Sequence, residues 1–185
     1  MIQLSTVMWV LAFFFAISGW NRGWNKELIA TAGIILGLFA LNQFDPLLRQ
    51  QLFGTLPDLE RNRTIFFMQS IIFIIIVFFA YQTRALIGDD ARRRDGRDGR
   101  DSLQESALGG ILGFINGYLI WGSLWYFMDI NRYPLQPDIV QPVAGSISAQ
   151  TREILPLVVL IGPEGRGDLL AIAVIALFLI VLIII

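Results

Sequence analysis

The feature that most constrains the fold is an uncharged stretch of 22 residues from Ala107 to Met128 (ALGGILGFINGYLIWGSLWYFM). A helix rises about 1.5 Å per residue, so this stretch can cross a hydrocarbon core of about 30 Å. Gly109, Gly113 and Gly117 recur every fourth residue and share one helical face, which lets another backbone come close. Asn116 is a polar side chain near the middle. The stretch predicts a membrane-spanning helix that packs against other helices.

The composition supports a membrane protein and excludes several kinds of function. Charged residues make up 16% of the chain, whereas they are about a quarter of a soluble domain. A formal net charge of −1 gives no basis for binding nucleic acid. The chain has neither cysteine nor histidine, which excludes disulfides, thiolate chemistry, Cys/His metal sites and histidine acid–base catalysis. We therefore expect no catalytic site, no metal and no cofactor.

The expected fold is an all-α membrane protein with interfacial amphipathic helices. Its core, residues 1–130, contains four predicted transmembrane helices at about residues 4–19, 27–44, 64–83 and 107–128. Residues 169–185 are apolar to the end of the chain and predict a fifth span. Residues 131–168 contain several prolines, which break helical continuity, and we expect this segment to lie at the membrane surface. Residues 144–155 could form one short amphipathic helix within it.

The first two spans are expected to form a helical hairpin that turns between Gly19 and Gly23. Gly33 and Gly37 lie on a small-residue face of the second span, as Gly19 does on the first. Alanine and glycine are also common in membrane helices generally, so this spacing alone leaves their partners open. Arg22 stands at the turn, where it could bond helix-end carbonyls and fix the turn, or contact a lipid or a partner.

Four further polar positions carry predictions. Glu27 suits the N-terminus of the second span, where the helix dipole favours an acid. Asp45 precedes a proline and reads as the N-cap of a short interfacial helix that begins at Pro46 and ends near Gly54 to Pro57, with a plain loop as the alternative. Gln69 and Ser70 are the deep polar groups of the third span and need partners in lipid, such as Asn116.

The segment 88–106 is a low-complexity run in which Arg-Asp-Gly repeats (GDDARRRDGRDGRDSLQES). Its acids come at every third residue, which does not match the spacing of an EF-hand loop. It also lacks the pattern of a calcium-binding nonapeptide repeat. Because five arginines face six acids, its attraction to anionic lipid should be weak. We expect a solvated, mobile linker.

Basic residues near the ends of the spans favour one orientation. The first turn and the third connection share one side and hold eight of them, whereas the second and fourth connections hold six. The bias towards basic cytoplasmic loops predicts an external N-terminus, a cytoplasmic 88–106 linker and a cytoplasmic C-terminus. Labelling single-cysteine variants at Ser102 and Asp138 from each side of the membrane tests this orientation, and an external Ser102 would contradict it.

Two stretches resemble the colicin V production family. Residues 19–28 (GWNRGWNKEL), followed by an apolar helix with glycines, look like its first block, and residues 108–117 (LGGILGFING), with Asp129 beyond them, look like its second. The family usually has an arginine where this chain has Asn116, and an acid–arginine pair where it has Glu105-Ser106. Roles that depend on those arginines do not transfer. The resemblance implies a protein of the bacterial cytoplasmic membrane connected with colicin V export or envelope upkeep.

Three functions from different classes are compatible with these patterns. The first is a non-enzymatic protein that acts through helix contacts with other membrane proteins or with a second copy of itself. The second is a small channel or transporter, for which Asn116 could line a polar path rather than pair between helices. The third is an accessory subunit of a larger respiratory or photosynthetic complex, docked through its last span. The expected partners are therefore the lipid bilayer and other membrane helices.

Overall fold

The computed structural model describes residues 3–82, 99–162 and 167–184, and these residues form helices joined by turns and loops. Four helices are long and apolar enough to cross a membrane, and a shorter apolar helix follows near the C-terminus, which confirms the predicted fold class. The elements in chain order are α1 (Leu4–Arg22), α2 (Trp24–Pro46), η1 (Leu47–Leu52), α3 (Asp58–Gln82), α5 (Gly99–Ile130), α6 (Ile147–Thr151), η2 (Arg152–Ile154), α7 (Pro156–Ile161) and α8 (Asp168–Ile184).

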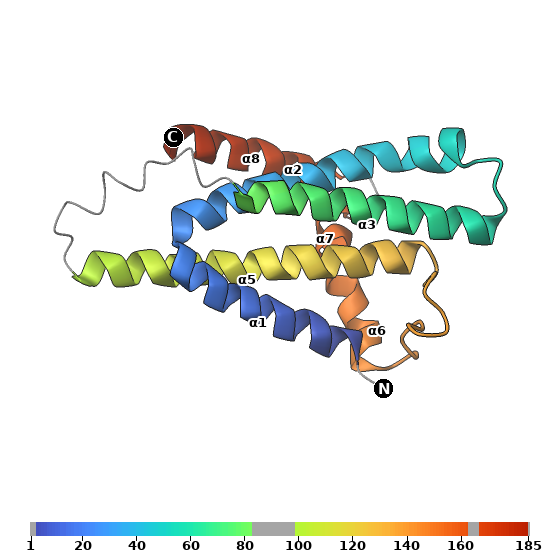
Figure 1. The fold of residues 1–185 in the computed structure, drawn as a ribbon, viewed down its shortest axis with the longest axis horizontal. Coiled ribbons are helices and arrows are strands. Elements are labelled where there is room, and N and C mark those ends of the chain that lie inside the picture. Colours follow the sequence, from blue (N-terminus) through green and yellow to red (C-terminus); the bar gives the residue numbers. More distant parts are fainter. Residues whose placement is uncertain (1–2, 83–98, 163–166, 185) are drawn as a thin grey trace.

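The long helices α1, α2, α3 and α5 run along the long axis of the molecule, and α8 lies beside α2 (Figure 1). The α1–α2 turn and the end of α8 lie at one end of this bundle. The start of α1, the η1–α3 connection and the loop after α5 lie at the other end (Figure 1). We call these the turn end and the N-terminal end. The first part of α5 extends past the other helices at the turn end.

The α1–α2 hairpin turns on one glycine. Gly23 has a φ of +81°, a conformation that side-chain-bearing residues rarely adopt, and it separates α1 from α2. Its backbone N–H donates to the carbonyl oxygen of Gly19 at 3.0 Å, which closes the last turn of α1. The chain therefore reverses with no intervening loop.

The closest contact in the bundle joins α1 to α5 through glycines. A methyl group added at Gly117 would lie 2.7 Å from the Cα of Ala12, and one added at Gly19 would lie 2.9 Å from the Cα of Gly113. A methyl group at Gly113 would overlap the carbonyl oxygen of Phe15. No β-carbon fits at these distances, so the two backbones touch. The glycine face of α5 is thus covered by this chain's own first helix.

The glycine face of α2 meets a different helix. A methyl group at Gly33 would lie 2.8 Å from the β-carbon of Ala80, and one at Gly37 would lie 2.7 Å from the Cγ2 atom of Ile76. Both partners belong to α3. The predicted small-residue faces therefore bind α1 to α5 and α2 to α3, and α2 also packs on α5 and α8.

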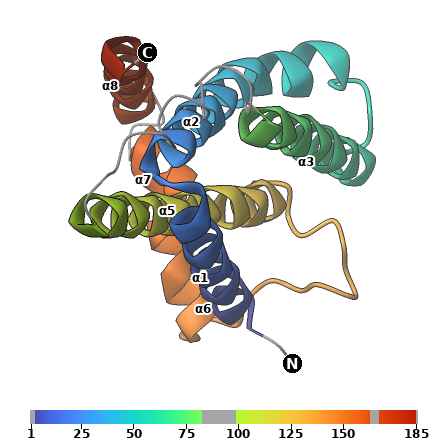
Figure 2. The same ribbon diagram turned by 60° about the vertical axis from the view of Figure 1, so that its left-hand side comes forward.

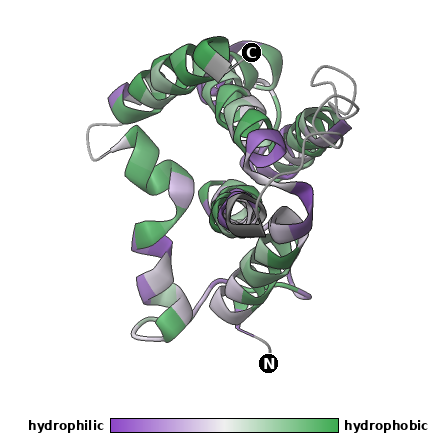
Figure 3. Ribbon diagram, turned by 90° about the vertical axis from the view of Figure 1, so that its left-hand side faces the viewer, coloured by the Kyte–Doolittle hydropathy of each residue, from purple (hydrophilic) through white to green (hydrophobic). Residues whose placement is uncertain are grey.

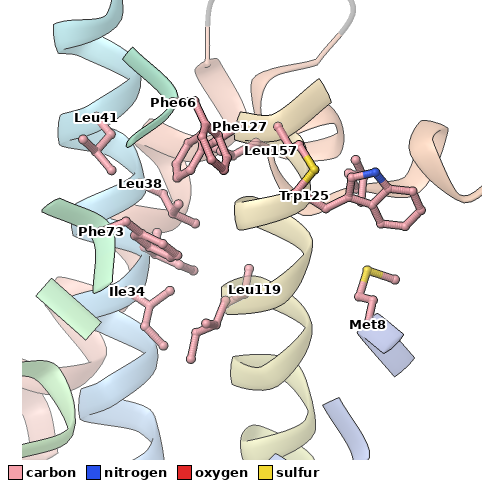
Figure 4. Close-up of a cluster of buried hydrophobic side chains, with 14 of the residues drawn as sticks. Met8, Ile34, Leu38, Leu41, Phe66, Phe73, Leu119, Trp125, Phe127 and Leu157 are labelled. Atoms are coloured by element: carbon pink, nitrogen blue, oxygen red, sulfur yellow. The ribbon is translucent and has the colours of Figure 1, made fainter. Parts of the chain in front are cut away.

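The core lies between α2, α3 and α5, with α1 and α7 closing its sides (Figure 4). Ile34, Leu38 and Phe73 are completely buried in it, and the ring of Phe73 meets the edge of Phe127 at a centroid distance of 5.7 Å. Large apolar side chains also cover the outside of the helices, including Phe13 at 64% exposure. Apolar residues colour both the inner and the outer faces of the helices (Figure 3). An apolar exterior suits a bundle surrounded by lipid.

The segment between α5 and α8 folds back across the long helices (Figures 1 and 2). The hydroxyl groups of Ser5 and Ser148 lie 3.0 Å apart and join the start of α1 to α6. At Gly122 of α5, an added methyl group would lie 2.7 Å from the Cγ atom of Pro156, so α7 packs directly on the α5 backbone. The amphipathic helix predicted over 144–155 is shorter, because Gly145 has a φ of +81° and the Ser146 side chain caps α6.

Two predictions at the ends of spans are wrong. Asp45 is not an N-cap, since α2 continues through Pro46 and is followed by the π-helical turn η1. The Asp45 carboxylate instead accepts hydrogen bonds from the side chains of Arg49 and Gln69. The predicted linker 88–106 also ends too late, because α5 already begins at Gly99. Its remaining part, residues 88–98, lies outside the described residues.

Candidate functional site

The first candidate site is a buried polar cluster centred on Glu27, which is 1% exposed. Its carboxylate accepts three side-chain hydrogen bonds. Arg22 Nη1 donates to Oε1 at 2.7 Å, Asn116 Nδ2 donates to Oε2 at 2.7 Å, and the Tyr81 hydroxyl donates to Oε2 at 3.1 Å. A carboxylate in a low-dielectric interior needs such partners, and an opposite charge above all.

Asn116 and Thr31 complete the cluster at its inner edge. Asn116 Nδ2 also donates to the backbone carbonyl of Glu27 at 3.1 Å. Thr31 Oγ1 lies 2.7 Å from Asn116 Oδ1 and 2.8 Å from the same carbonyl, so its proton can go to either oxygen. The completely buried amide of α5 is thereby tied to the first turns of α2.

Arg22 connects this cluster to the end of α3. Its Nη2 atom donates to the backbone carbonyl of Tyr81 at 3.2 Å, and its guanidinium carbon lies 4.3 Å from the centroid of the Tyr81 ring. A cation at a helix C-terminus is favoured by the helix dipole, and one over an aromatic ring by the ring quadrupole. The side chain therefore bonds a helix-end carbonyl, one of the two roles that its position in the sequence predicts.

A second polar cluster lies at the N-terminal end of the bundle. Arg49 Nε donates to both carboxylate oxygens of Asp45, at 3.0 and 2.9 Å, and Arg49 Nη2 donates to Asn131 Oδ1 at 3.0 Å. Gln69 Nε2 donates to Asp45 Oδ1 at 2.9 Å, and Asn131 Nδ2 donates to Gln69 Oε1 at 3.1 Å. The four side chains form a closed ring of hydrogen bonds that joins α2, η1, α3 and the end of α5.

A third ion pair holds the segment after α5. The Nε atom of Arg152 lies 2.9 Å from Asp129 Oδ1, and its Nη2 atom donates to Asp129 Oδ2 at 2.9 Å. Beside this pair, Trp125 Nε1 donates to the hydroxyl of Tyr133 at 3.1 Å. Burial of the phenol raises the pKa of Tyr133 to about 12, so the hydroxyl stays protonated at neutral pH.

The two clusters lie near opposite ends of α2, with an apolar layer between them. Glu27 and Asp45 are 18 residues apart, which corresponds to about 27 Å of helix, close to the thickness of a hydrocarbon core. Ile34, Leu38 and Leu119 fill the interval and are buried. In each cluster one arginine balances one acid. The geometry therefore suits two ion-paired clusters without net charge, each of which would join helices near one membrane surface.

Several sequence predictions can be placed on this arrangement. We expected Asn116 to pair with Gln69 or Ser70, and it does not. Those two residues lie towards the other end of the bundle from Glu27, to which Asn116 is bonded. Ser70 Oγ has no hydrogen-bond partner among the described residues. The sequence analysis did not predict the role of Tyr81, because nothing in the apolar run that contains it marks this tyrosine as a hydrogen-bond partner of Glu27. Thr31 carried a weak signal, being four residues after Glu27 and thus on the same helical face.

The described residues contain no group of three or more Asp, Glu, His or Cys side chains that could hold a metal ion. The carboxylates of the two clusters each face an arginine instead. Their chemistry is therefore that of ion pairs that hold helices together.

The fold and these clusters define an all-helical, multi-pass membrane protein whose spans carry internally paired charges. Residues 4–151 match the family described as Colicin V production protein. The chain belongs to this family. No curated protein and no solved structure matches the chain.

We predict that breaking the Arg22–Glu27 pair destabilises the bundle. Glu27→Gln and Arg22→Gln should each lower the free energy of unfolding by about 3 kcal/mol, the lower end of the range for a broken buried ion pair, because Arg22 is partly exposed. The double variant should lose less than the two losses added together, since each single change leaves the other residue without its partner. Helicity followed during titration with a denaturing detergent measures these differences.

The control is Arg61→Gln, which removes an exposed ion pair with Asp58 on α3 and should change the stability little. Losses at Arg22 and Glu27 that simply add, or that are no larger than the loss in the control, would contradict a stabilising role for the cluster.

Proposed function

We propose that this protein is a non-enzymatic membrane scaffold that acts in colicin V production or export, or in envelope upkeep, by contacting other membrane proteins through the outer faces of its helices. The observation that carries the proposal is the placement of the charged groups. The pairs Arg22–Glu27, Asp45–Arg49 and Asp129–Arg152 all form within the chain. The large outward surface is apolar and is available to other helices.

The helix α8 is the surface that we assign to partners. It packs on α2 and α7 along one side, with Leu170 completely buried there. On the opposite side, Ile172, Ile175 and Leu182 are 60%, 61% and 63% exposed. These positions are three and seven residues apart and so share one stripe of the helix. An apolar stripe of this kind can pack against another transmembrane helix. The same surface would serve an accessory subunit of a larger complex.

The apolar layer between the clusters argues against a channel within one chain. A polar path past Asn116 would have to continue between Ile34, Leu38, Phe73 and Leu119, all of which are buried. Within the described residues no charged side chain lies between Glu27 and Asp45 on α2. Ion flux through proteoliposomes that is lost with Asn116→Leu would support a channel instead.

The scaffold proposal predicts site-specific cross-links from α8. A photoreactive residue at Ile175 should give a protein–protein adduct of defined mass in living cells, whereas the same residue at Leu177, which packs against the core, should not. The variant Ile172→Trp/Ile175→Trp should lower colicin V secretion in cells that produce the toxin, at an unchanged level of the protein. Secretion that persists without the gene, together with lipid adducts alone at Ile175, would overturn the proposal.

A further inference from the structure

A groove opens on the side of the bundle between α1 and α3, with α5 as its floor. It has a volume of about 440 Å³. The ribbons of α1 and α3 diverge on either side of α5 (Figure 2). Its walls are almost entirely apolar, with Met8 from α1, Phe66 and Ile74 from α3, and Trp121 and Trp125 from α5. The loop after α5 closes one end with Leu135 and Ile139.

The groove runs from the N-terminal end of the bundle towards its middle. On α5 its lining extends from Met128 back to Trp121, about 10 Å along the helix, which is roughly two thirds of the depth of one leaflet's hydrocarbon. Ser70 follows Gln69 of the second polar cluster, and the α3 part of the lining extends one turn further out, to Phe66. The groove thus has the direction and depth of a single chain in one leaflet.

Ser70 is a buried polar residue in the otherwise apolar lining of the groove. The side chain is 8% exposed, and its Oγ atom has no hydrogen-bond partner among the described residues. Burying a hydroxyl without a partner costs free energy, so an acceptor from outside the chain is expected there. The indole Nε1 of Trp121, deeper in the groove, also has no partner in the described part of the chain.

We infer that this groove binds one acyl chain of a glycerophospholipid, with the ester carbonyl accepting a hydrogen bond from Ser70 Oγ. An ester carbonyl has free lone pairs and lies at the depth where a chain begins. Arg63 and Arg132 are exposed, and each lies within about one turn or a few residues of a residue that lines the groove. Both can therefore meet the lipid phosphate. This inference goes beyond the proposed function.

The test uses the full-length protein in proteoliposomes that contain a trace of phosphatidylglycerol with a photoreactive acyl chain. Mass spectrometry then locates the labelled residues. We expect labelling to concentrate on the groove lining and to be displaced by unlabelled diacyl phosphatidylglycerol. The dialkyl ether analogue, which has no carbonyl, should compete about fivefold less well, the effect of one net hydrogen bond of about 1 kcal/mol. Ser70→Ala should abolish this preference for ester over ether.

A matched pair of variants on α3 separates the groove from general lipid contact. Ile74 lines the groove and Ile75 does not, yet they are 52% and 49% exposed. Ile74→Trp should fill the groove and remove most of the displaceable labelling, while Ile75→Trp should leave it intact. Equal effects of the two variants would overturn the inference.

Three other results would also overturn it. If free fatty acid competed as well as the diacyl lipid, the groove would recognise an acyl chain alone and not a phospholipid. A prenyl quinone competing better than either would point to a ligand with two carbonyls, one for Ser70 and one for Trp121. Groove residues that cross-link to a protein, and not to the lipid, would identify a partner helix as the occupant.

Discussion

Contact between the backbones of α1 and α5 is the interaction on which the rest of this structure depends. In lipid, helices gain little from hiding apolar surface, so association depends on close packing and on polar contacts. Glycines at 19, 113 and 117 let the two helices approach until no β-carbon fits between them. Because α1 is locked in place, the turn at Gly23 sends α2 back along α5. That path brings Glu27 within 2.7 Å of Asn116.

The two polar clusters then fix the remaining helices at both ends of α2. The cluster around Glu27 draws together the end of α1, the start of α2, the end of α3 and the middle of α5. The cluster around Asp45 does the same for η1, α3 and the end of α5. Each combines one cation with one anion, which limits the cost of placing charge in a medium of low dielectric. Between them the interior is mostly apolar, with the buried hydroxyl of Ser123 as an exception, so the bundle is held at both ends and closely packed in the middle.

This arrangement directs the protein's interactions outward. The charged groups of the pairs Arg22–Glu27, Asp45–Arg49 and Asp129–Arg152 face one another, and the glycine faces are occupied by the chain's own helices. What is left for other molecules is apolar surface on α1, α3 and α8 and the groove that leads to Ser70. This interior is consistent with the scaffold that we propose, which would act by holding helices and lipid in position.

The sequence predicted the elements of this fold better than their partners. Long uncharged runs fix the spans because only a helix satisfies its own backbone in lipid, and glycines four residues apart mark a contact face. The same spacing does not indicate which helix covers that face, so the contact of α1 with Gly113 could not be predicted from the sequence. Asn116 and Glu27 are 89 residues apart, and no local pattern links them. At Asp45, a motif that caps many helices was overridden by bonds to the distant side chain of Gln69.

The most direct test of the α1–α5 contact compares two glycines on the same turn of α5. An added methyl group at Gly113 overlaps the Phe15 carbonyl, whereas one at Gly110 has 3.4 Å to its nearest neighbour, Trp20. Measured as unfolding free energies in the same detergent, Gly113→Ala should destabilise the protein by about 1 to 3 kcal/mol, the usual cost of overpacking, and Gly110→Ala should not destabilise it. Equal stability of the two variants would contradict the account.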